Sequence, residues 1–378
     1  MKQKRVKIGI PIGGSWPLDV LVENVRYAES MGVDCIWTTN RAAPMDREPL
    51  ITLAILAQHL KKARIGAWSI DPYLYHPASV CRAMAQIDEM APGRVLLGWT
   101  PGTWMILGSF GFPESIRPLG RMREAVEFSK LLLSGKVPAG AVEDKIVRSA
   151  AIPDEYLVSY PGKHFKMSNN ILIPPRKVPV MVSSFSPKML QLAGELADEV
   201  GTGWFAIPGA NEWALEQIEV GAKRSGRTLD DLVLHRSIHI CAWPDRKVAL
   251  ETISPISSVV LFVNGHLRKR FGIQLPMEDS PGSIMDAGSA MFQAMSEMGL
   301  KGYMGASDLG FSEEILLTES VAGTPEECVQ QLKEKVLHPS FDVLNFAPFA
   351  PEPEAENWRK AVEILMKEVV PALDLPGR

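Results

Sequence analysis

The sequence has few cysteines and no long apolar run, and both absences exclude classes of protein. Its four cysteines, Cys35, Cys81, Cys241 and Cys328, are scattered without a CxxC pair, so we expect reduced thiols rather than a disulfide framework or a zinc site. No window approaches the roughly 18 consecutive apolar residues of a membrane helix. The basic start MKQKRVKIGIPIGG continues into too short an apolar stretch for a secretory signal core. We therefore expect a cytoplasmic protein with no membrane partner.

The sequence also lacks a large excess of either sign of charge. The formal net charge is −4 and no long basic run occurs, so nothing indicates a nucleic-acid partner. Only His235 and His239 have a spacing that a metal site uses, and we expect them to alternate badly on a strand and to lack carboxylate neighbours. We therefore predict no metal. A content of 46% hydrophobic and 22% charged residues is typical of a globular protein with a large core.

Strand-like and helix-like segments alternate along the whole chain. We expect strands at 6–12, 34–39, 64–70, 93–100, 179–184, 199–203, 232–242 and 342–346, with helices after the first seven. Several strands are apolar throughout, which indicates a parallel sheet covered by helices. GIPIGGSW lacks the GxGxxG spacing that an open doubly wound sheet would normally show. We predict an α/β fold, a (β/α)₈ TIM barrel forming a single domain over residues 1–378.

Two insertions interrupt this alternation, at about 135–178 and about 255–322. The first contains YPGKHFKMSNNILIPP, which we expect to form a small hairpin that caps the barrel. The second is expected to contain extra helices and loop, and to act as a lid or a dimer contact.

Ligands of such barrels bind at the loops that follow the carboxyl ends of the strands. Four segments in these positions would ring one cavity, namely TTNRAAPM, WSIDPYLYHP, TPGTWM and SSFSPKML. WSIDPYLYHP carries more polar and aromatic side chains than a connector requires, and Pro72 cannot continue a strand ladder. Trp99, Trp104 and Trp204 either wall an aromatic pocket or fill the barrel rim.

A possible anion site follows the fifth strand. Ser183, Ser184 and Ser186 precede Pro187, which suits the first position of a helix. Free amides and hydroxyls at a helix N-terminus favour an anion, and Lys188 would add positive charge. The alternative is that Ser186 serves only as an N-cap.

Five segments, in order, resemble the superfamily of luciferase-like monooxygenases and deazaflavin-dependent reductases. They are IGAWSIDPYLYHP, AQIDEMAPGR, VLLGWTPGTW, PVMVSSFSPKMLQLAGELADEV and AGTPEECVQQL. The length and the large insertion before the last strand are most similar to the reductase branch, which includes phthiodiolone ketoreductase, methylenetetrahydromethanopterin reductase and a deazaflavin-dependent glucose-6-phosphate dehydrogenase. The resemblance implies a (β/α)₈ barrel, usually a homodimer, that holds coenzyme F420 or FMN at the carboxyl ends of the strands.

The resemblance also implies where the cofactor lies. A non-proline cis peptide is implied in a bulge at the end of the third strand, which places it at Trp68-Ser69 beside Ile70, against the cofactor ring. The cofactor phosphate is implied near the serines after the fifth strand and the exit of the sixth. The cofactor-binding residues expected in this way are Thr39, Asn40, Trp68, Ser69, Ile70, Asp71, Thr100, Gly102, Thr103, Ser183, Ser184, Ser186, Lys188, Gly201, Thr202 and Gly203.

The sequence departs from its relatives where they carry acids. Thr103 stands where reductases of this branch have a carboxylate beyond the glycine, and the acidic residue near the end of the first strand is missing around Pro11. Asn40 stands at the position of a histidine in the sugar-phosphate enzyme and is either a ring contact or a turn asparagine, but it cannot act as a base.

The catalytic acid or base is thus left open among Asn40, Asp71, Tyr73 and His76. Asp71 either closes a turn before Pro72 or contacts the cofactor ring. His76 is either a general base or a cap of the helix that begins after it.

The main hypothesis is an F420-dependent oxidoreductase that transfers a hydride between the deazaflavin C5 and a small substrate, a ketone, an alcohol or a C1-carrying pterin. The alternatives are an FMN-dependent monooxygenase and a cofactor-binding barrel without catalysis. A small hint favours F420, because its polyglutamate tail suits basic side chains on candidate loops, namely Lys163, Arg176, Lys177 and Lys188.

Overall fold

The computed structural model describes residues 5–12, 16–39, 47–102, 107, 118–134, 157–170, 176–203, 205–275, 311–352 and 354–378. The structural statements below concern these residues. Asn40, Thr103, Trp104 and Trp204, which were singled out above, lie outside them, and so does the side chain of Ser69.

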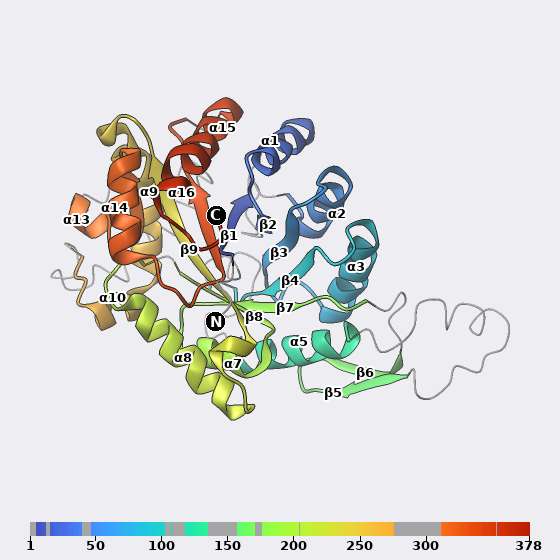
Figure 1. Cartoon of the computed structure of the whole chain (residues 1–378). Coiled ribbons are helices and arrows are strands. Elements are labelled where there is room, and N and C mark those ends of the chain that lie inside the picture. The colour runs from blue at the N-terminus through green and yellow to red at the C-terminus, as the bar shows by residue number, and fades with distance from the viewer. Residues whose placement is uncertain are drawn as a thin grey trace.

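Eight parallel strands close into a barrel (Figure 1). They are β1 (Lys7–Ile12), β2 (Cys35–Thr39), β3 (Arg64–Ile70), β4 (Val95–Trp99), β7 (Val180–Ser183), β8 (Glu199–Gly203), β9 (Val233–Ala242) and β11 (Val343–Pro348). The ring closes because β9 pairs with both β8 and β11, and β11 pairs with β1. The predicted (β/α)₈ barrel is confirmed. The first and last residues of each strand lie within two residues of their expected positions.

Helices surround the strands, and many begin at a proline. They are α1 (Leu18–Ser30), α2 (Pro49–His59), α3 (Pro77–Met90), α5 (Pro118–Leu132), α7 (Pro187–Leu196), α8 (Ala210–Arg224), α9 (Arg246–Val263), α14 (Pro325–Lys335) and α15 (Ala355–Ile364), the last continued by η4 (Leu365–Val369) and α16 (Val370–Ala372). A short 3₁₀ turn, η2 (Leu229–Asp231), leads into β9. Proline suits a first helical position because its ring presets φ and the missing N–H has no helical partner there.

The second insertion follows α9, which runs beyond Pro255 to Val263. It contains two expected helices, α10 (Gly265–Phe271) and α13 (Glu313–Leu316), and an unexpected strand, β10 (Ser320–Gly323). β8 pairs with the first half of β9, and β10 pairs with the second half, where Ser320 lies opposite His239. The sheet is therefore widened by one strand at its carboxyl end.

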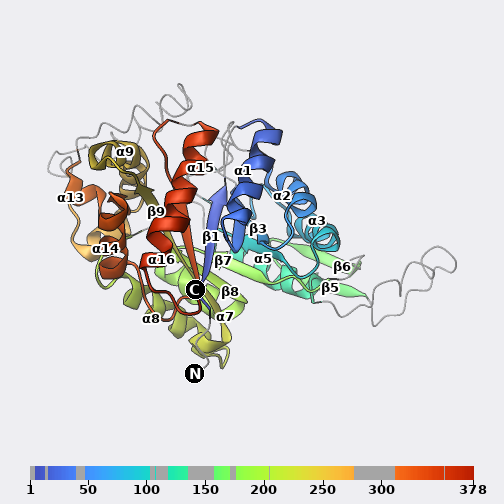
Figure 2. The ribbon, with the colours of Figure 1, turned by 45° about the horizontal axis from the view of Figure 1, so that its top comes forward.

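The first insertion contains the expected hairpin, but not in the expected place. β5 (Val158–Pro161) pairs with β6 (Lys166–Asn170) antiparallel. The carboxylate of Glu124 in α5 accepts hydrogen bonds from the amides of Lys163, His164 and Phe165. These bonds hold the hairpin against α5, beside the barrel rather than over its mouth (Figure 2). The prediction that it caps the barrel is wrong.

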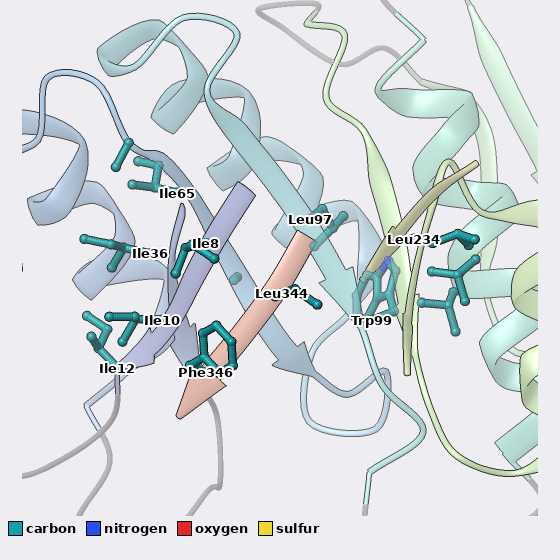
Figure 3. Packing of buried hydrophobic residues seen from close by; sticks show 14 of the residues in the cluster. Ile8, Ile10, Ile12, Ile36, Ile65, Leu97, Trp99, Leu234, Leu344 and Phe346 are labelled. Carbon is teal, nitrogen blue, oxygen red and sulfur yellow. The ribbon is translucent and has the colours of Figure 1, made fainter. Parts of the chain in front are cut away.

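Apolar side chains fill both faces of the barrel wall, which explains why its strands read as apolar throughout. The layer between strands and helices includes Ile8, Ile36, Leu97, Leu234, Leu344 and Phe346 (Figure 3). A second cluster lies on the other face of the strands and comprises Cys35, Trp37, Trp68, Leu96, Met181 and Val343. The four cysteines are buried free thiols. Among the described helices, none has the length and hydropathy that a membrane crossing needs.

Candidate functional site

A chain of polar side chains crosses the interior of the barrel. Arg64 donates to Glu199 at 2.7 Å, and Glu199 meets Nε2 of His235 at 2.7 Å. Nδ1 of His235 lies 3.4 Å from Nδ2 of Asn345, whose Oδ1 accepts from Nε1 of Trp37 at 2.6 Å. Burial raises the pKa of Glu199, but the hydrogen bonds and charges of His235 and Arg64 outweigh it and leave the pKa at about 2. This hydrogen-bonded network fixes the side chains that lie in the barrel interior beneath the carboxyl ends of the strands.

The two histidines of β9 correct a prediction made from the sequence. His235 and His239 were expected to lack carboxylate neighbours, but Nδ1 of His239 lies 2.6 Å from Oε1 of Glu319, and His235 is bonded to Glu199. The carboxylates come from β8 and from the residue before β10, far away in the sequence. Only the pairing of these strands with β9 brings them together.

The bulge predicted in β3 is present. The register between β3 and β4 shifts between Ala67 and Ile70. The Trp68 ring is buried and makes edge-on contacts with Trp37 and His235, at ring-centroid distances of 5.9 and 6.2 Å. A Cβ on Gly98 would lie 2.8 Å from the Ala67 carbonyl oxygen, so glycine is required beside the bulge. The cis peptide at Trp68-Ser69 remains a prediction.

The loop after β3 is closed by Asp71. Its Oδ1 accepts from the amides of Tyr73 and Leu74 at 3.0 and 2.9 Å. Burial raises the pKa of Asp71, although these amides oppose the shift. Gly102 lies beside this turn with a left-handed φ of 74°, which favours glycine, and a Cβ there would lie 2.8 Å from Cδ1 of Leu107. The contacts support the turn-closing interpretation of Asp71.

Two other catalytic candidates face α5 and the hairpin. The guanidinium of Arg121 lies 4.7 Å above the Tyr73 ring, and burial raises the pKa of Tyr73 against the opposing charge of Arg121. His76 is exposed, accepts the Ala78 amide at 3.2 Å through Nδ1, and makes an edge-on ring contact with Phe165. The contacts support His76 as the cap of α3.

The proposed anion site is assembled where β7 and β8 end. Ser183 lies opposite Gly201, where an added Cβ would be 2.8 Å from the serine Oγ. Oγ of Ser184 accepts the Ser186 amide at 3.2 Å, and Ser186 occupies the N-cap position of α7 without a side-chain capping bond. The Ser186 hydroxyl therefore does not perform the capping role that the alternative interpretation assigned to it. Lys188 is exposed in the first turn of α7.

The remaining cofactor candidates lie at the carboxyl ends of β2, β4 and β8. Thr39 donates to the Ile12 carbonyl at 3.3 Å, and the amide of Thr100 donates to the Ile70 carbonyl at 2.9 Å. Gly203 lies against Ser237, where a Cβ would be 2.3 Å from the Ser237 carbonyl oxygen. The buried side chain of Thr202 alternates away from Gly201 and lines a small cavity of about 20 Å³ shared with α8 and α10.

Two of the four basic residues proposed for a polyglutamate tail, Arg176 and Lys177, lie at the wrong end of the barrel. Arg176 pairs with Glu89 in the last turn of α3, and Lys177 bridges to Ser134 just beyond α5. Both helices end at the amino ends of the strands, opposite to the ligand-binding end of a barrel. The amide of Lys163 is bound by Glu124 in the hairpin turn. Lys188 lies at the carboxyl ends, in the first turn of α7.

The sequence is similar to known proteins along most of its length. It matches the family of luciferase-like monooxygenases over residues 7–338. It is 27% identical to the 5,10-methylenetetrahydromethanopterin reductase of Archaeoglobus fulgidus, over 92% of this chain and 94% of that protein. It is 25% identical to the F420-dependent glucose-6-phosphate dehydrogenase of Microbacterium testaceum, over 59% of this chain and 64% of that protein.

Solved structures share the fold. The coenzyme F420-dependent tetrahydromethanopterin reductase of Methanopyrus kandleri superposes with a TM-score of 0.76 at 21% identity, covering 98% of this chain and all of that one. An F420-dependent secondary alcohol dehydrogenase superposes with a TM-score of 0.69 at 18% identity, over 98% of this chain and 99% of that one. The match to the family extends over most of the chain, and the protein belongs to the luciferase-like monooxygenase family.

Proposed function

We propose that the protein is a coenzyme F420-dependent reductase whose substrate is a tetrahydropterin that carries a one-carbon unit. The observation that supports this proposal is the share of this chain with which each class of relative aligns. Relatives named 5,10-methylenetetrahydromethanopterin reductase align with 92 to 96% of this chain. Relatives named F420-dependent glucose-6-phosphate dehydrogenase align with only 55 to 69% of it. The pterin class therefore aligns with nearly the whole of this chain.

The carboxyl ends of the strands fit a flat ring with a phosphate. The hydroxyl of Ser186, at the N-terminus of α7, is not used in a cap. Oγ of Ser237 is buried without a hydrogen-bond partner among the described residues. Such an orphaned polar atom on β9, opposite Gly203 at the end of β8, is consistent with a bound polar ligand.

Two groups of residues would hold the cofactor. The ring would rest on the β3 bulge and the loops beside it, formed by Thr39, Asn40, Trp68, Ser69, Ile70, Asp71, Thr100, Gly102 and Thr103. The phosphate would bind at the α7 N-terminus and the end of β8, near Ser183, Ser184, Ser186, Lys188, Gly201, Thr202 and Gly203. The reduced deazaflavin, when bound, supplies a hydride from its C5.

The protein's own contribution is mainly orientation. Trp68 is fixed from below by Trp37 and His235, and Asp71 fixes the turn that follows the bulge. Such a rigid set of side chains would hold the reacting carbon of the substrate at a defined distance from the cofactor ring. Positioning of this kind removes much of the free-energy barrier to a bimolecular transfer.

Binding and turnover together test the proposal. Purified protein is titrated with oxidised F420 and, separately, with FMN, following tryptophan fluorescence. Oxidation of reduced F420 is then followed without oxygen in the presence of 5,10-methylenetetrahydromethanopterin, 5,10-methylenetetrahydrofolate, acetone or glucose-6-phosphate. We expect F420 to bind and a methylene pterin to be reduced. Preference for FMN with oxygen consumption would instead favour a monooxygenase, and binding of neither cofactor would favour a barrel without catalysis.

A further inference from the structure

Arg121, in the first turn of α5, is held against the loop that follows β3. Its Nη1 donates to the Pro72 carbonyl at 3.2 Å, and its guanidinium lies 4.7 Å from the centre of the Tyr73 ring. The Phe165 ring, which belongs to the hairpin, lies 5.4 Å from the same guanidinium. Aromatic faces attract a guanidinium electrostatically, so these contacts hold the Arg121 side chain in one place.

The guanidinium nevertheless keeps most of its hydrogen-bonding capacity. It carries five N–H donors in a planar fork, and among the described residues only the Pro72 carbonyl accepts from it. Arg123, two residues further along α5, donates to both carboxylate oxygens of Glu195 at 2.8 Å. Arg121 forms no such ion pair within the described part of the chain, and it is half-buried rather than enclosed. An immobilised arginine without a carboxylate of its own is suited to bind one from a ligand.

The turn of the hairpin brings further positive charge toward Arg121. Lys163 and His164 are exposed, and Nε2 of His164 would lie 3.4 Å from a Cβ on Gly120, the residue before Arg121. The acid in this region, Glu124, accepts hydrogen bonds from the amides of Lys163 and His164. Glu124 therefore anchors the turn beside the start of α5, and the ammonium of Lys163 adds to the charge of the guanidinium there.

This arginine lies next to the place where we put the cofactor ring. Pro72, which Arg121 binds, comes two residues after Ile70, the last residue of the bulged strand β3. At most about 7 Å of chain separates the two residues. Asp71 between them is buried, and its Oδ1 accepts two backbone amides, which direct its charge into the turn. A ligand whose ring rests on the bulge therefore has Arg121 within reach of a flexible arm.

We propose that Arg121 and the hairpin turn form a carboxylate-binding site at the rim of the barrel. The site receives the acidic tail of a ligand, and the identity of that ligand rests on the proposed function. Two molecules of the proposed reaction carry such a tail, namely F420 with its polyglutamate and a one-carbon tetrahydropterin with its terminal acid. The guanidinium suits a carboxylate bound side-on through two parallel N–H bonds, and Lys163 attracts the same negative charge. The hairpin thus contributes Phe165 and Lys163 to ligand binding from beside the barrel.

The site is tested first with tri-γ-glutamate, a tail without a ring, by isothermal titration into the purified protein. We expect binding that is at least tenfold weaker in Arg121→Gln, the usual effect of losing a charge-assisted hydrogen bond. Arg121→Lys should retain part of the affinity, and it gives the same test if Arg121→Gln does not fold. Lys166→Gln removes an exposed charge from the same hairpin and should bind as the wild type does. No binding to the wild type, or equal affinity in Arg121→Gln, would overturn the proposal.

Ligands with and without a tail then identify the source of the carboxylate. Wild type and Arg121→Gln are compared in their affinity for F420 with and without its glutamates. They are also compared in their KM for 5,10-methylenetetrahydrofolate and for 5,10-methylenetetrahydropteroate, which lacks the glutamate. A loss of affinity confined to the complete F420 assigns the site to the cofactor. A higher KM confined to the folate, with unchanged kcat, assigns it to the substrate.

The remaining outcomes separate the site from the proposed function. Equal losses with and without the tail would show that Arg121 only supports the loop of Tyr73, and no loss with any ligand would show that it binds neither tail. Either result would overturn the proposal. If the wild type binds tri-γ-glutamate through Arg121 but binds no F420 and reduces no pterin, the proposed function fails and the carboxylate site stands.

Discussion

The ring of Trp68 faces the imidazole of His235 across the barrel interior, with ring centroids 6.2 Å apart and planes at 71°. Trp68 belongs to the bulge of β3, and His235 is held by Glu199 and Asn345. The backbone on which we place the cofactor ring is thus supported by a side chain whose own position depends on a buried ion pair. Stability and cofactor binding are therefore expected to be coupled at this point.

Replacing Glu199 by glutamine should destabilise the protein strongly. The change leaves Arg64 without its carboxylate in a largely buried position, and breaking such a pair from one side costs about 3 to 5 kcal/mol. Urea unfolding measures the difference. The matched control is Glu195→Gln, which breaks the more exposed pair with Arg123 and should cost about 1 kcal/mol or less. Equal losses in the two variants would contradict the structural role of Glu199.

The same residue predicts a pH dependence of stability. Burial raises the pKa of Glu199, but His235 and Arg64 outweigh it, and the pKa lies at about 2 in the folded state against an ordinary 4.5. Because the unfolded chain binds this proton more readily, the stabilisation is complete above pH 4.5 and is lost as the pH falls through about 2. The difference in unfolding free energy between wild type and Glu199→Gln should therefore shrink over this window. A difference that stays constant with pH would refute the assignment.

Gly98→Ala should disturb the bulge and weaken cofactor binding. The new Cβ would stand 2.8 Å from the Ala67 carbonyl oxygen and 3.3 Å from the Trp68 Cα, so the backbone of β3 must move. We expect a loss of about 1 to 3 kcal/mol in stability, as for other overpacked cores, and at least a tenfold weaker binding of F420. Gly120→Ala in α5 is the control, because its Cβ meets no backbone and alanine is favoured in helices. Unchanged F420 affinity in Gly98→Ala would argue against the bulge as the cofactor platform.

Two helix N-caps distinguish a binding role from a structural one. Ser186 makes no capping bond at α7, whereas Thr324 accepts the Glu327 amide in a capping box at α14. Ser186→Ala should therefore weaken F420 binding by a few-fold to tenfold with little change in stability. Thr324→Ala should lose about 1 kcal/mol of stability and bind the cofactor normally. The reverse pattern would show that Ser186 is only a cap.

The sequence predicted the barrel well because each strand and helix has a local signal. The apolar run of β3 and the Pro77 that opens α3 are visible without any partner. The polar pairs were missed because Glu199 and His235 are 36 residues apart, and His239 and Glu319 are 80 apart. Spacing rules find ligands on one element, whereas these pairs exist only through strand pairing. The predicted position of Arg176 and Lys177 was wrong for a related reason. Both residues follow a long insertion that returns to the amino ends of the strands.

The most direct test of the account is the anaerobic oxidation of reduced F420 by 5,10-methylenetetrahydromethanopterin in the presence of the wild-type protein. We predict turnover that requires both partners and produces the methyl pterin and oxidised F420 in equal amounts. Tight binding of FMN without any binding of F420, or F420 binding with no turnover of a methylene pterin, would contradict the proposed function.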